Sequence, residues 1–198
     1  FLASPLGAAP SSEADHELLW LTPGEAAQRL SLGADRWALD RARAGGVLLP
    51  AVRPVIAPPE DLAVLVDAAL AQGFGAVRRL RDDWASGANR FDRPGEALFE
   101  ARLDGGLAGI CGLSVDPFAG DPKVGRVRRL FVRPDVRRLG IGRALVEAVV
   151  ERARPHFAEL HLRTHSAEAD AFYRALGFRP LSGREPSTHH LPLGGGGT

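Results

Sequence analysis

The chain has 198 residues, of which 45% are hydrophobic and 25% charged, a composition that fits one globular core with a small appendage. A formal net charge of +1 excludes a global field that would draw the molecule onto nucleic acid or a membrane. The single cysteine, Cys111, excludes an internal disulfide and predicts a reducing, cytoplasmic location. No apolar run approaches the roughly 18 to 20 residues that a transmembrane helix needs, and the first residues lack a signal-peptide pattern.

The first 50 residues divide into a tail and a helical extension. Residues 1–17 combine Ala, Ser, Pro and acidic side chains without periodicity, which predicts disorder. Within residues 18–50, Thr22-Pro23-Gly24-Glu25 is a capping box that opens one helix. Asp35 caps a second helix, which ends at Gly45-Gly46. Because residue 1 is Phe and the chain has no methionine, we expect it to be incomplete at its start.

The same pair of helices is partly similar to a DNA-binding motif. The two helices, separated by Gly33 and followed by Leu49-Pro50-Ala51-Val52-Arg53, resemble the start of excisionase-like winged helix-turn-helix domains. This resemblance implies that residues 35–43 form a recognition helix whose arginines meet phosphates. Asp35 and Asp40 reduce the positive charge of that helix, so nucleic-acid binding is not favoured. The alternative is a helical extension that packs on the rest of the chain or forms a dimer contact.

Residues 51–193 show an alternation of strand and helix patterns. A short strand falls within residues 48–56, Pro59 opens a helix that Gly73 ends, and a more polar helix covers 76–85. After a loop over 86–95, two strands form a hairpin through the turn Asp104-Gly105-Gly106. The expected elements from the hairpin onward are strands at 97–103, 107–115 and 126–132, a helix at 141–153, a strand at 160–164, a helix at 167–176, strands near 178 and 188–191, and a glycine-rich tail at 194–198.

The most informative segment is the turn between the strand at 126–132 and the helix at 141–153. It reads Arg-Arg-Leu-Gly-Ile-Gly-Arg from Arg137 to Arg143. The first turn of a helix has unpaired N–H groups and the positive end of the helix dipole, so it favours an anion. Gly140 and Gly142 lack the Cβ atoms that would keep a pyrophosphate away, and the arginines add positive charge. The alternative is an ordinary helix start with solvated arginines.

A second motif follows further along the chain, where Phe172-Tyr173 and Gly177-Phe178 frame the end of the last helix. Together and in this order, the two motifs resemble the pyrophosphate loop and the F-Y-x-x-x-G-F segment of the GNAT acyltransferases, which bind acetyl-CoA. The resemblance covers residues 51–193. It implies a mixed α+β (α/β) fold with a central, mostly antiparallel twisted sheet, a splayed parallel strand pair and flanking helices.

By position, the GNAT resemblance also implies acetyl-CoA as co-substrate. The strand backbone before the turn would hold the pantetheine arm, and the turn would hold the pyrophosphate. Ser166 stands where a family asparagine often bonds the pantetheine. Tyr173 stands where a tyrosine protonates the departing thiolate, with a purely packing role as the alternative. The implied cofactor-binding residues are Leu130, Phe131, Val132, Arg137, Arg138, Leu139, Gly140, Ile141, Gly142, Arg143 and Ser166.

The usual base of the family has no equivalent in this sequence. Many members carry a glutamate just before the Leu-Phe-Val equivalent, where this chain has Arg128-Arg129, and arginine stays protonated. The alternatives for proton transfer, directly or through water, are Glu96, Glu100, Asp116, His165 and His189.

Candidate residues for the acceptor lie in the loop after residue 86 and near the C-terminus. Asn89, Arg90 and Phe91 are expected near the acceptor, where Asn89 and Arg90 suit a carboxylate or carbonyl group. His189 is a further candidate. Because His189 and its neighbour His190 would point to opposite faces of a strand, we expect no metal site.

The resemblance therefore implies an N-acetyltransferase that moves an acetyl group from acetyl-CoA to a primary amine by direct attack on the thioester. The acceptor could be a small molecule or a peptide. Two other functions stay open: an inactive acyl-CoA-binding module, motivated by the missing glutamate, and a DNA-binding regulator with an acetyl-CoA-sensing domain. An edge strand near the C-terminus leaves a homodimer open as well.

Overall fold

The chain divides between Leu49 and Pro50 into two units, and the computed structural model describes residues 50–183 and 186–194 of the second unit. Its strands form a seven-stranded sheet in the order β1-β2-β3-β4-β5-β7-β6. The strands are β1 (Ala51–Val55), β2 (Ala97–Leu103), β3 (Gly106–Val115), β4 (Val124–Val132), β5 (Glu159–Leu162), β6 (Arg179–Pro180) and β7 (His189–Pro192).

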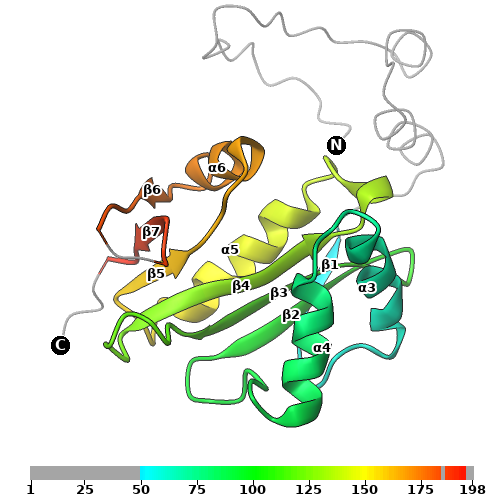
Figure 1. Cartoon of the computed structure of the whole chain (residues 1–198), viewed down its shortest axis with the longest axis horizontal. Helices are drawn as coiled ribbons and strands as arrows, with labels where there is room; N and C mark the ends of the chain where they lie inside the picture. Colours follow the sequence, from blue (N-terminus) through cyan, green and yellow to red (C-terminus); the bar gives the residue numbers. More distant parts are fainter. Residues whose placement is uncertain (1–49, 184–185, 195–198) are drawn as a thin grey trace, which may run out of the picture. The chain divides into compact units, whose positions relative to one another are not determined.

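Helices cover both faces of this sheet (Figure 1). On one face, α5 packs on β3, where Gly109 faces Leu145 and Ile141. On the other face, α3 and α4 build an apolar core with side chains of β2, β3 and β4, among them Leu98, Ile110 and Phe131. The helical elements are η1 (Glu60–Leu62), α3 (Ala63–Leu70), α4 (Ala76–Ser86), η2 (Pro134–Val136), α5 (Ile141–Ala153) and α6 (Ala167–Arg174).

The architecture that the sequence predicts is confirmed. The sheet is antiparallel throughout except for β4 and β5, which run parallel. Each strand and helix expected between residues 51 and 193 is present, with ends that differ by a few residues. The predicted tail 1–17, the helical extension 18–50 apart from Pro50, and the glycine-rich tail after Gly194 lie outside the described residues.

One predicted helix is interrupted. The segment from Pro59 to Gly73 begins as η1, because Asp61 has non-helical angles (φ −87°, ψ 17°). The Asp61 carboxylate accepts hydrogen bonds from Arg102 at 3.0 and 2.8 Å and from the Leu107 N–H group at 3.3 Å. These tertiary bonds hold the start of the segment against the sheet, which a pattern of apolar spacing does not reveal.

Close packing on the sheet depends on glycine at two positions. A Cβ atom on Gly125 would lie 2.7 Å from Leu160 on the α5 face. On the opposite face, a Cβ atom on Gly112 would overlap the ring of Phe91, a buried side chain from the loop after α4. Gly112 therefore lets this loop lie directly on β3.

We expect Gly112→Ala to lower the free energy of unfolding by about 1–3 kcal/mol, because the added methyl group overpacks the contact with Phe91. Gly106→Ala is the matched control on the same strand, since its Cβ would meet the nearest atom at an ordinary 3.6 Å. Its effect should stay within about 0.5 kcal/mol. Chemical denaturation of both variants measures the difference, and equal effects would contradict this packing.

Candidate active site

The parallel strands β4 and β5 separate soon after they begin. They pair only between Val124–Arg126 and Glu159–His161, so from residue 127 onward the β4 edge that faces β5 has no strand partner among the described residues. On its other edge, β4 has one residue more than β3 between two paired positions, Arg128 opposite Gly112 and Phe131 opposite Ile110. Within this bulge Arg129 has a positive φ of 60°. Such a β-bulge bends the strand and increases its twist. The predicted pantetheine segment Leu130–Val132 therefore presents backbone groups without a strand partner.

The turn after β4 contributes a row of N–H groups. The N–H groups of Arg138, Leu139 and Gly140 donate to no acceptor among the described residues. Those of residues 141–143 open α5 and have no acceptor within the helix. Arg138 and Gly140 have positive φ angles of 67° and 77°, and left-handed residues curve a run of N–H groups into an anion site. The donors thus form the arrangement that a pyrophosphate requires.

The two glycines of this turn have different roles. At Gly140 a Cβ atom would meet nothing within 4 Å, so the left-handed backbone is what requires glycine there. At Gly142 a Cβ atom would lie 3.5 Å from the ring of Phe172, an ordinary contact. The protein itself would accept a methyl group at residue 142, and glycine leaves the backbone open to a ligand. The same contact places the start of α5 beside α6.

The three predicted arginines of the turn are not equivalent. The Arg137 guanidinium donates to the Val132 carbonyl at 3.1 Å and to Gln72 at 2.7 Å, and it lies over the ring of Phe131. It is therefore fixed at the end of β4. Arg138 and Arg143 are exposed, and the Arg143 guanidinium lies 3.5 Å from the Glu147 carboxylate. These two side chains can turn toward an anion at the loop.

Ser166 caps α6. Its hydroxyl oxygen accepts a hydrogen bond from the Ala169 N–H group at 3.1 Å, as N-cap serines do. The residue is exposed and follows β5, across the gap from β4. The structure thus gives Ser166 a local role in starting the helix that carries Tyr173.

Tyr173 lies inside the fold. Its ring packs edge-on against Phe172 and Phe178, at centroid distances of 5.1 and 5.5 Å. Burial raises the pKa of its hydroxyl far above the ordinary value, and the nearby Cys111 thiol adds to the rise. Cys111 belongs to the part of β3 that faces the bulge of β4. A hydroxyl in this environment remains protonated, which is the state that a proton donor needs.

The predicted acceptor residue His189 is buried between β7 and α6. Its Nε2 atom lies 2.8 Å from the Asp170 carboxylate, and its Nδ1 atom lies 3.0 Å from the Thr188 hydroxyl. Hydrogen bonds from Arg174 and then from His189 hold the pKa of Asp170 below its usual value. His189 thereby ties the helix of Tyr173 to the sheet.

The predicted acceptor loop lies on the sheet face opposite α5. The Asn89 side chain is buried and accepts a hydrogen bond from the Phe91 N–H group at 3.0 Å, which shapes the turn. Phe91, with a φ of 53°, places its ring on Gly112. Arg90 is exposed and donates to the Trp84 carbonyl. Of the three residues, Phe91 is the one that the structure places on the sheet.

Beside Phe91, β4 carries three arginines. Arg126 and Arg128 stand opposite Ser114 and Gly112 of β3, and directly paired residues share a face. Their side chains therefore lie on the face that carries Phe91. The Arg126 guanidinium is buried and contacts Asp116 at 3.1 Å, and that of Arg129 contacts Asp83 of α4 at 2.7 Å. Arg128 has no hydrogen bond or ion pair within the described ranges.

His161 of β5 lies beside the pair of Arg126 and Asp116, and no sequence motif indicates this position. It is buried, and its Nδ1 atom lies 3.0 Å from Asp116. Its Nε2 atom is 3.2 Å from Glu159 but makes no well-directed hydrogen bond. The alternation Leu160-His161-Leu162 contained the signal, because it places the histidine on the face opposite the two leucines. Asp116, a candidate base, is thus occupied by Arg126 and His161.

Two other candidate bases are placed differently. Glu96 is buried, accepts a hydrogen bond from the Val115 N–H group at 2.9 Å and pairs with Arg93 at 3.4 Å. It closes the end of the β2–β3 hairpin. His165 is exposed just after β5, so it is the more accessible of the two to solvent.

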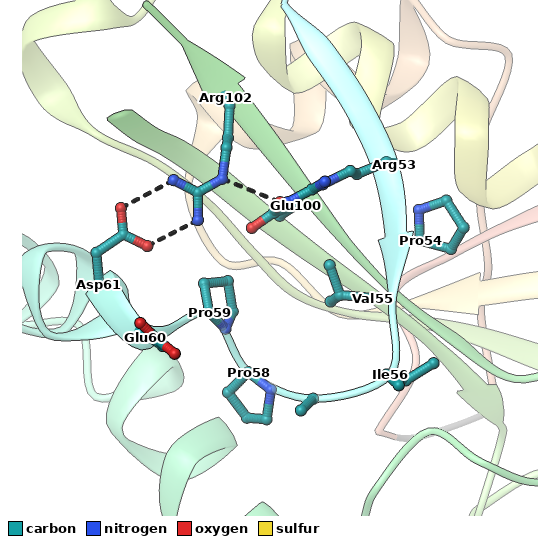
Figure 2. A pocket seen from close by; sticks show the side chains of 11 residues that line it. Arg53, Pro54, Val55, Ile56, Pro58, Pro59, Glu60, Asp61, Glu100 and Arg102 are labelled. Atoms are coloured by element: carbon teal, nitrogen blue, oxygen red, sulfur yellow. Dashed lines mark hydrogen bonds and ion pairs between the residues drawn. The ribbon is translucent and has the colours of Figure 1, made fainter. Parts of the chain in front are cut away.

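A cavity of about 670 Å³ lies at the β1 edge of the sheet, where residues of β1, β2 and η1 line it. In Figure 2 the Arg102 guanidinium reaches Asp61 with one side and Glu100 with its Nε atom. Arg53 contacts Glu100 at 2.6 Å. Burial raises the pKa of Glu100, but the hydrogen bonds and charges of Arg102 and Arg53 outweigh it and hold the pKa below its usual value. Glu100 is therefore a structural ion-pair partner, two strands away from β4.

Within the described residues, no group of three or more His, Cys, Asp or Glu side chains is arranged to hold a metal ion. Within the same ranges no helix has both the length and the apolar character to cross a membrane.

Comparison with known proteins gives consistent results. A family model described as Acetyltransferase (GNAT) family matches residues 65–178, whereas no curated protein matches the chain. A protein from Exiguobacterium sp. 255-15 that is named as an acetyltransferase is 29% identical, with a TM-score of 0.65 over 73% of this chain and 93% of that one. A GNAT family N-acetyltransferase (YhbS) from Escherichia coli, crystallised in complex with CoA, is 18% identical, with a TM-score of 0.58 over 75% of this chain and 84% of that one.

The ion pairs around Arg102 predict a pH dependence of stability. Its hydrogen bonds lower the pKa of Asp61, and with Arg53 it lowers that of Glu100. Such carboxyl groups stabilise the fold above their unfolded pKa of about 4, and that contribution is lost as pH falls through the lower folded pKa. We expect Arg102→Met to cost about 1–3 kcal/mol at pH 7 and to flatten the loss of stability below about pH 5.

Chemical denaturation at several pH values measures both effects. Arg81→Met is the matched control, because Arg81 pairs with Asp82 on the surface, where both side chains are more than half exposed. It should leave the pH dependence unchanged. Parallel curves for wild type and Arg102→Met would contradict the role given to this guanidinium.

Proposed function

Since the chain belongs to the GNAT acetyltransferase family, we propose that it transfers the acetyl group of acetyl-CoA to a primary amine. The observation that carries this proposal is the row of unpaired N–H groups from Arg138 to residue 143, at the end of a strand whose edge lacks a partner. An elongated ligand with a pyrophosphate at one end and amide groups along its arm fits both features. The E. coli structure in complex with CoA supports this choice of ligand.

The bound acetyl-CoA would run along the free edge of β4. Its pyrophosphate would accept hydrogen bonds from the turn, with Arg138 and Arg143 adding charge. The amides of its pantetheine arm would pair with the backbone of Leu130–Val132, as a short strand would. Ser166 would meet the arm from the other side of the gap. The thioester would then lie near the bulge at Arg129, within reach of Tyr173.

The reaction needs three things from the protein. The acceptor amine, as the free base, attacks the thioester carbonyl carbon, and the carbonyl electrons move onto oxygen. A backbone N–H group of Leu130–Val132 stabilises this oxyanion. The carbonyl then re-forms, the carbon–sulfur bond breaks, and the thiolate takes the proton of the Tyr173 hydroxyl. The phenolate recovers a proton from the new ammonium through water.

The reaction also needs the acceptor amine in its uncharged form. Arg129 occupies the position of the usual glutamate, so no carboxylate base stands there. Asp116 and Asp83 already pair with Arg126 and Arg129 of β4. We propose that the amine loses its proton to water and attacks as the free base.

Binding of acetyl-CoA tests the site directly. We expect Gly142→Asp to weaken binding by about tenfold or more, because a carboxylate at the turn repels the pyrophosphate. The protein has room for the new Cβ atom, so the fold should persist. Arg152→Ala is the control, since it changes the net charge by the same amount at the exposed far end of α5. Isothermal titration calorimetry measures both, and unchanged binding to Gly142→Asp would contradict this placement.

The role of Tyr173 predicts a loss of turnover. Tyr173→Phe keeps the ring packing and removes the proton donor, so kcat should fall by about 100-fold or more, while acetyl-CoA affinity and thermal stability change little. Thiol release with a panel of primary amines measures kcat, and calorimetry measures the affinity. Equal kcat in both proteins would leave Tyr173 with its packing role alone. Binding without turnover in either protein would favour the inactive acyl-CoA-binding module.

A further inference from the structure

On the sheet face that carries Phe91, one of the three arginines of β4 lacks a carboxylate partner among the described residues. Arg126 and Arg129 each contact an aspartate, Asp116 at 3.1 Å and Asp83 at 2.7 Å. Arg128 lies between them in sequence, and its guanidinium contacts no carboxylate and no other acceptor among the described residues. It is only partly exposed. Charged side chains that are withdrawn from water are normally paired, so Arg128 is the exception in this cluster.

The neighbouring charges make the protonated state of the unpaired Arg128 still less favourable. Burial is the main factor that lowers the pKa of Arg128, and the charge of Arg129 lowers it further, followed by a smaller effect of Arg126. Asp83 and Asp116 act in the opposite direction, but each is already bound to another arginine. An arginine stays protonated even so, and its surplus positive charge is relieved by an added anion.

A second, independent observation lies next to it. The Nε atom of Arg129 is buried and has no hydrogen-bond partner in the part of the chain that the structure describes, although its Nη2 atom binds Asp83. A buried donor without a partner usually marks the place of a bound water or ligand. Arg129 is also the bulged residue with a positive φ, and strained backbone of this kind gathers at functional sites. Two adjacent guanidinium groups therefore have unused donors on one face.

The position of Arg128 relates these donors to the reaction. It stands opposite Gly112, beside the ring of Phe91 on the sheet. Two residues further along β4 is Leu130, where the proposed thioester site begins. An arginine side chain and a short amine can span the two residues, which rise roughly 7 Å along a strand.

We propose, on the basis of the proposed acetyl transfer, that the acceptor amine also carries an anionic group, a carboxylate or a phosphate, which binds to Arg128. The anion completes the charge balance of the arginine cluster and orients the amine toward the thioester. Arg128 is then a specificity-determining residue for the acceptor. The sequence pointed to Asn89 and Arg90 for such a group, whereas the structure favours Arg128, which precedes the position of the missing glutamate.

Matched pairs of acceptors test the proposal. Glycine, β-alanine and O-phosphoethanolamine are compared with glycinamide, β-alaninamide and ethanolamine, with thiol release as the readout. For the best anionic acceptor, kcat/KM should exceed that of its neutral partner by about tenfold or more, mainly through KM. Arg128→Gln should reduce this ratio by about 10- to 100-fold, and Arg128→Lys by less. A ratio near one in wild type, or an equal loss for charged and neutral acceptors, would overturn the proposal.

Arg78→Gln is the control variant, because Arg78 is an exposed arginine of α4 without a partner among the described residues. It should keep the wild-type ratio. The control separates the effect of Arg128 from the general loss of one positive charge.

A binding measurement separates this proposal from the proposed reaction. With CoA at saturation to fill the pyrophosphate site, inorganic phosphate or propionate at constant ionic strength should raise the melting temperature of wild type more than that of Arg128→Gln. Equal shifts in both proteins would overturn the anion site, whatever the turnover. Arg128-dependent shifts without thiol release from any acceptor would support the anion site and overturn the proposed acetyl transfer.

Discussion

The separation of β4 from β5 is the constraint on which the rest of the structure depends. A strand inside a sheet normally satisfies its N–H and C=O groups on both edges. Here the parallel pair ends at Arg126, and β4 continues for six residues with one edge unpaired. Backbone groups left in this state need a partner from water or a ligand. The unpaired backbone groups of β4 therefore lower the stability of the fold, and the same groups are accessible for hydrogen bonds with a ligand.

The elements around the gap are arranged so that it stays open. The bulge at Arg129 bends β4, and α5 begins at a point where Gly142 lies beside Phe172 of α6. His189 and Asp170 fasten α6 to β7 on the far side. The Ser166 cap starts the helix at the end of β5. The contacts of Gly142 with Phe172 and of His189 with Asp170 join different elements, whereas the Ser166 cap is local. Together they set the positions of Tyr173 and of the turn before α5.

The charged side chains at the β1 edge of the sheet are paired differently from those along the central strand β4. Around β1 and β2, Arg53 and Arg102 form ion pairs with Glu100 and Asp61 (Figure 2). The charged side chains that line the cavity there are therefore paired with one another. Along β4, the arginines outnumber the carboxylates that contact them. An unpaired charge that is partly withdrawn from water is unfavourable for stability, and the proposed anion at Arg128 would remove this cost.

The sequence by itself determined the order of elements, including the glycine-containing turn before α5 and the helix that carries Tyr173, because these depend on local signals. Apolar periodicity, glycine placement and the Phe172–Phe178 segment act over a few residues, and most element ends fall close to those expected. It did not reveal η1, the pairing of Glu100 with two arginines, or His161 beside Asp116. Nor did it separate Gly140, needed for its backbone angle, from Gly142, where a Cβ atom would fit. Only the tertiary structure decided these points, since strand register and charge pairing join residues that are far apart in sequence, such as Ala51 and Arg102, and depend on the burial of both partners.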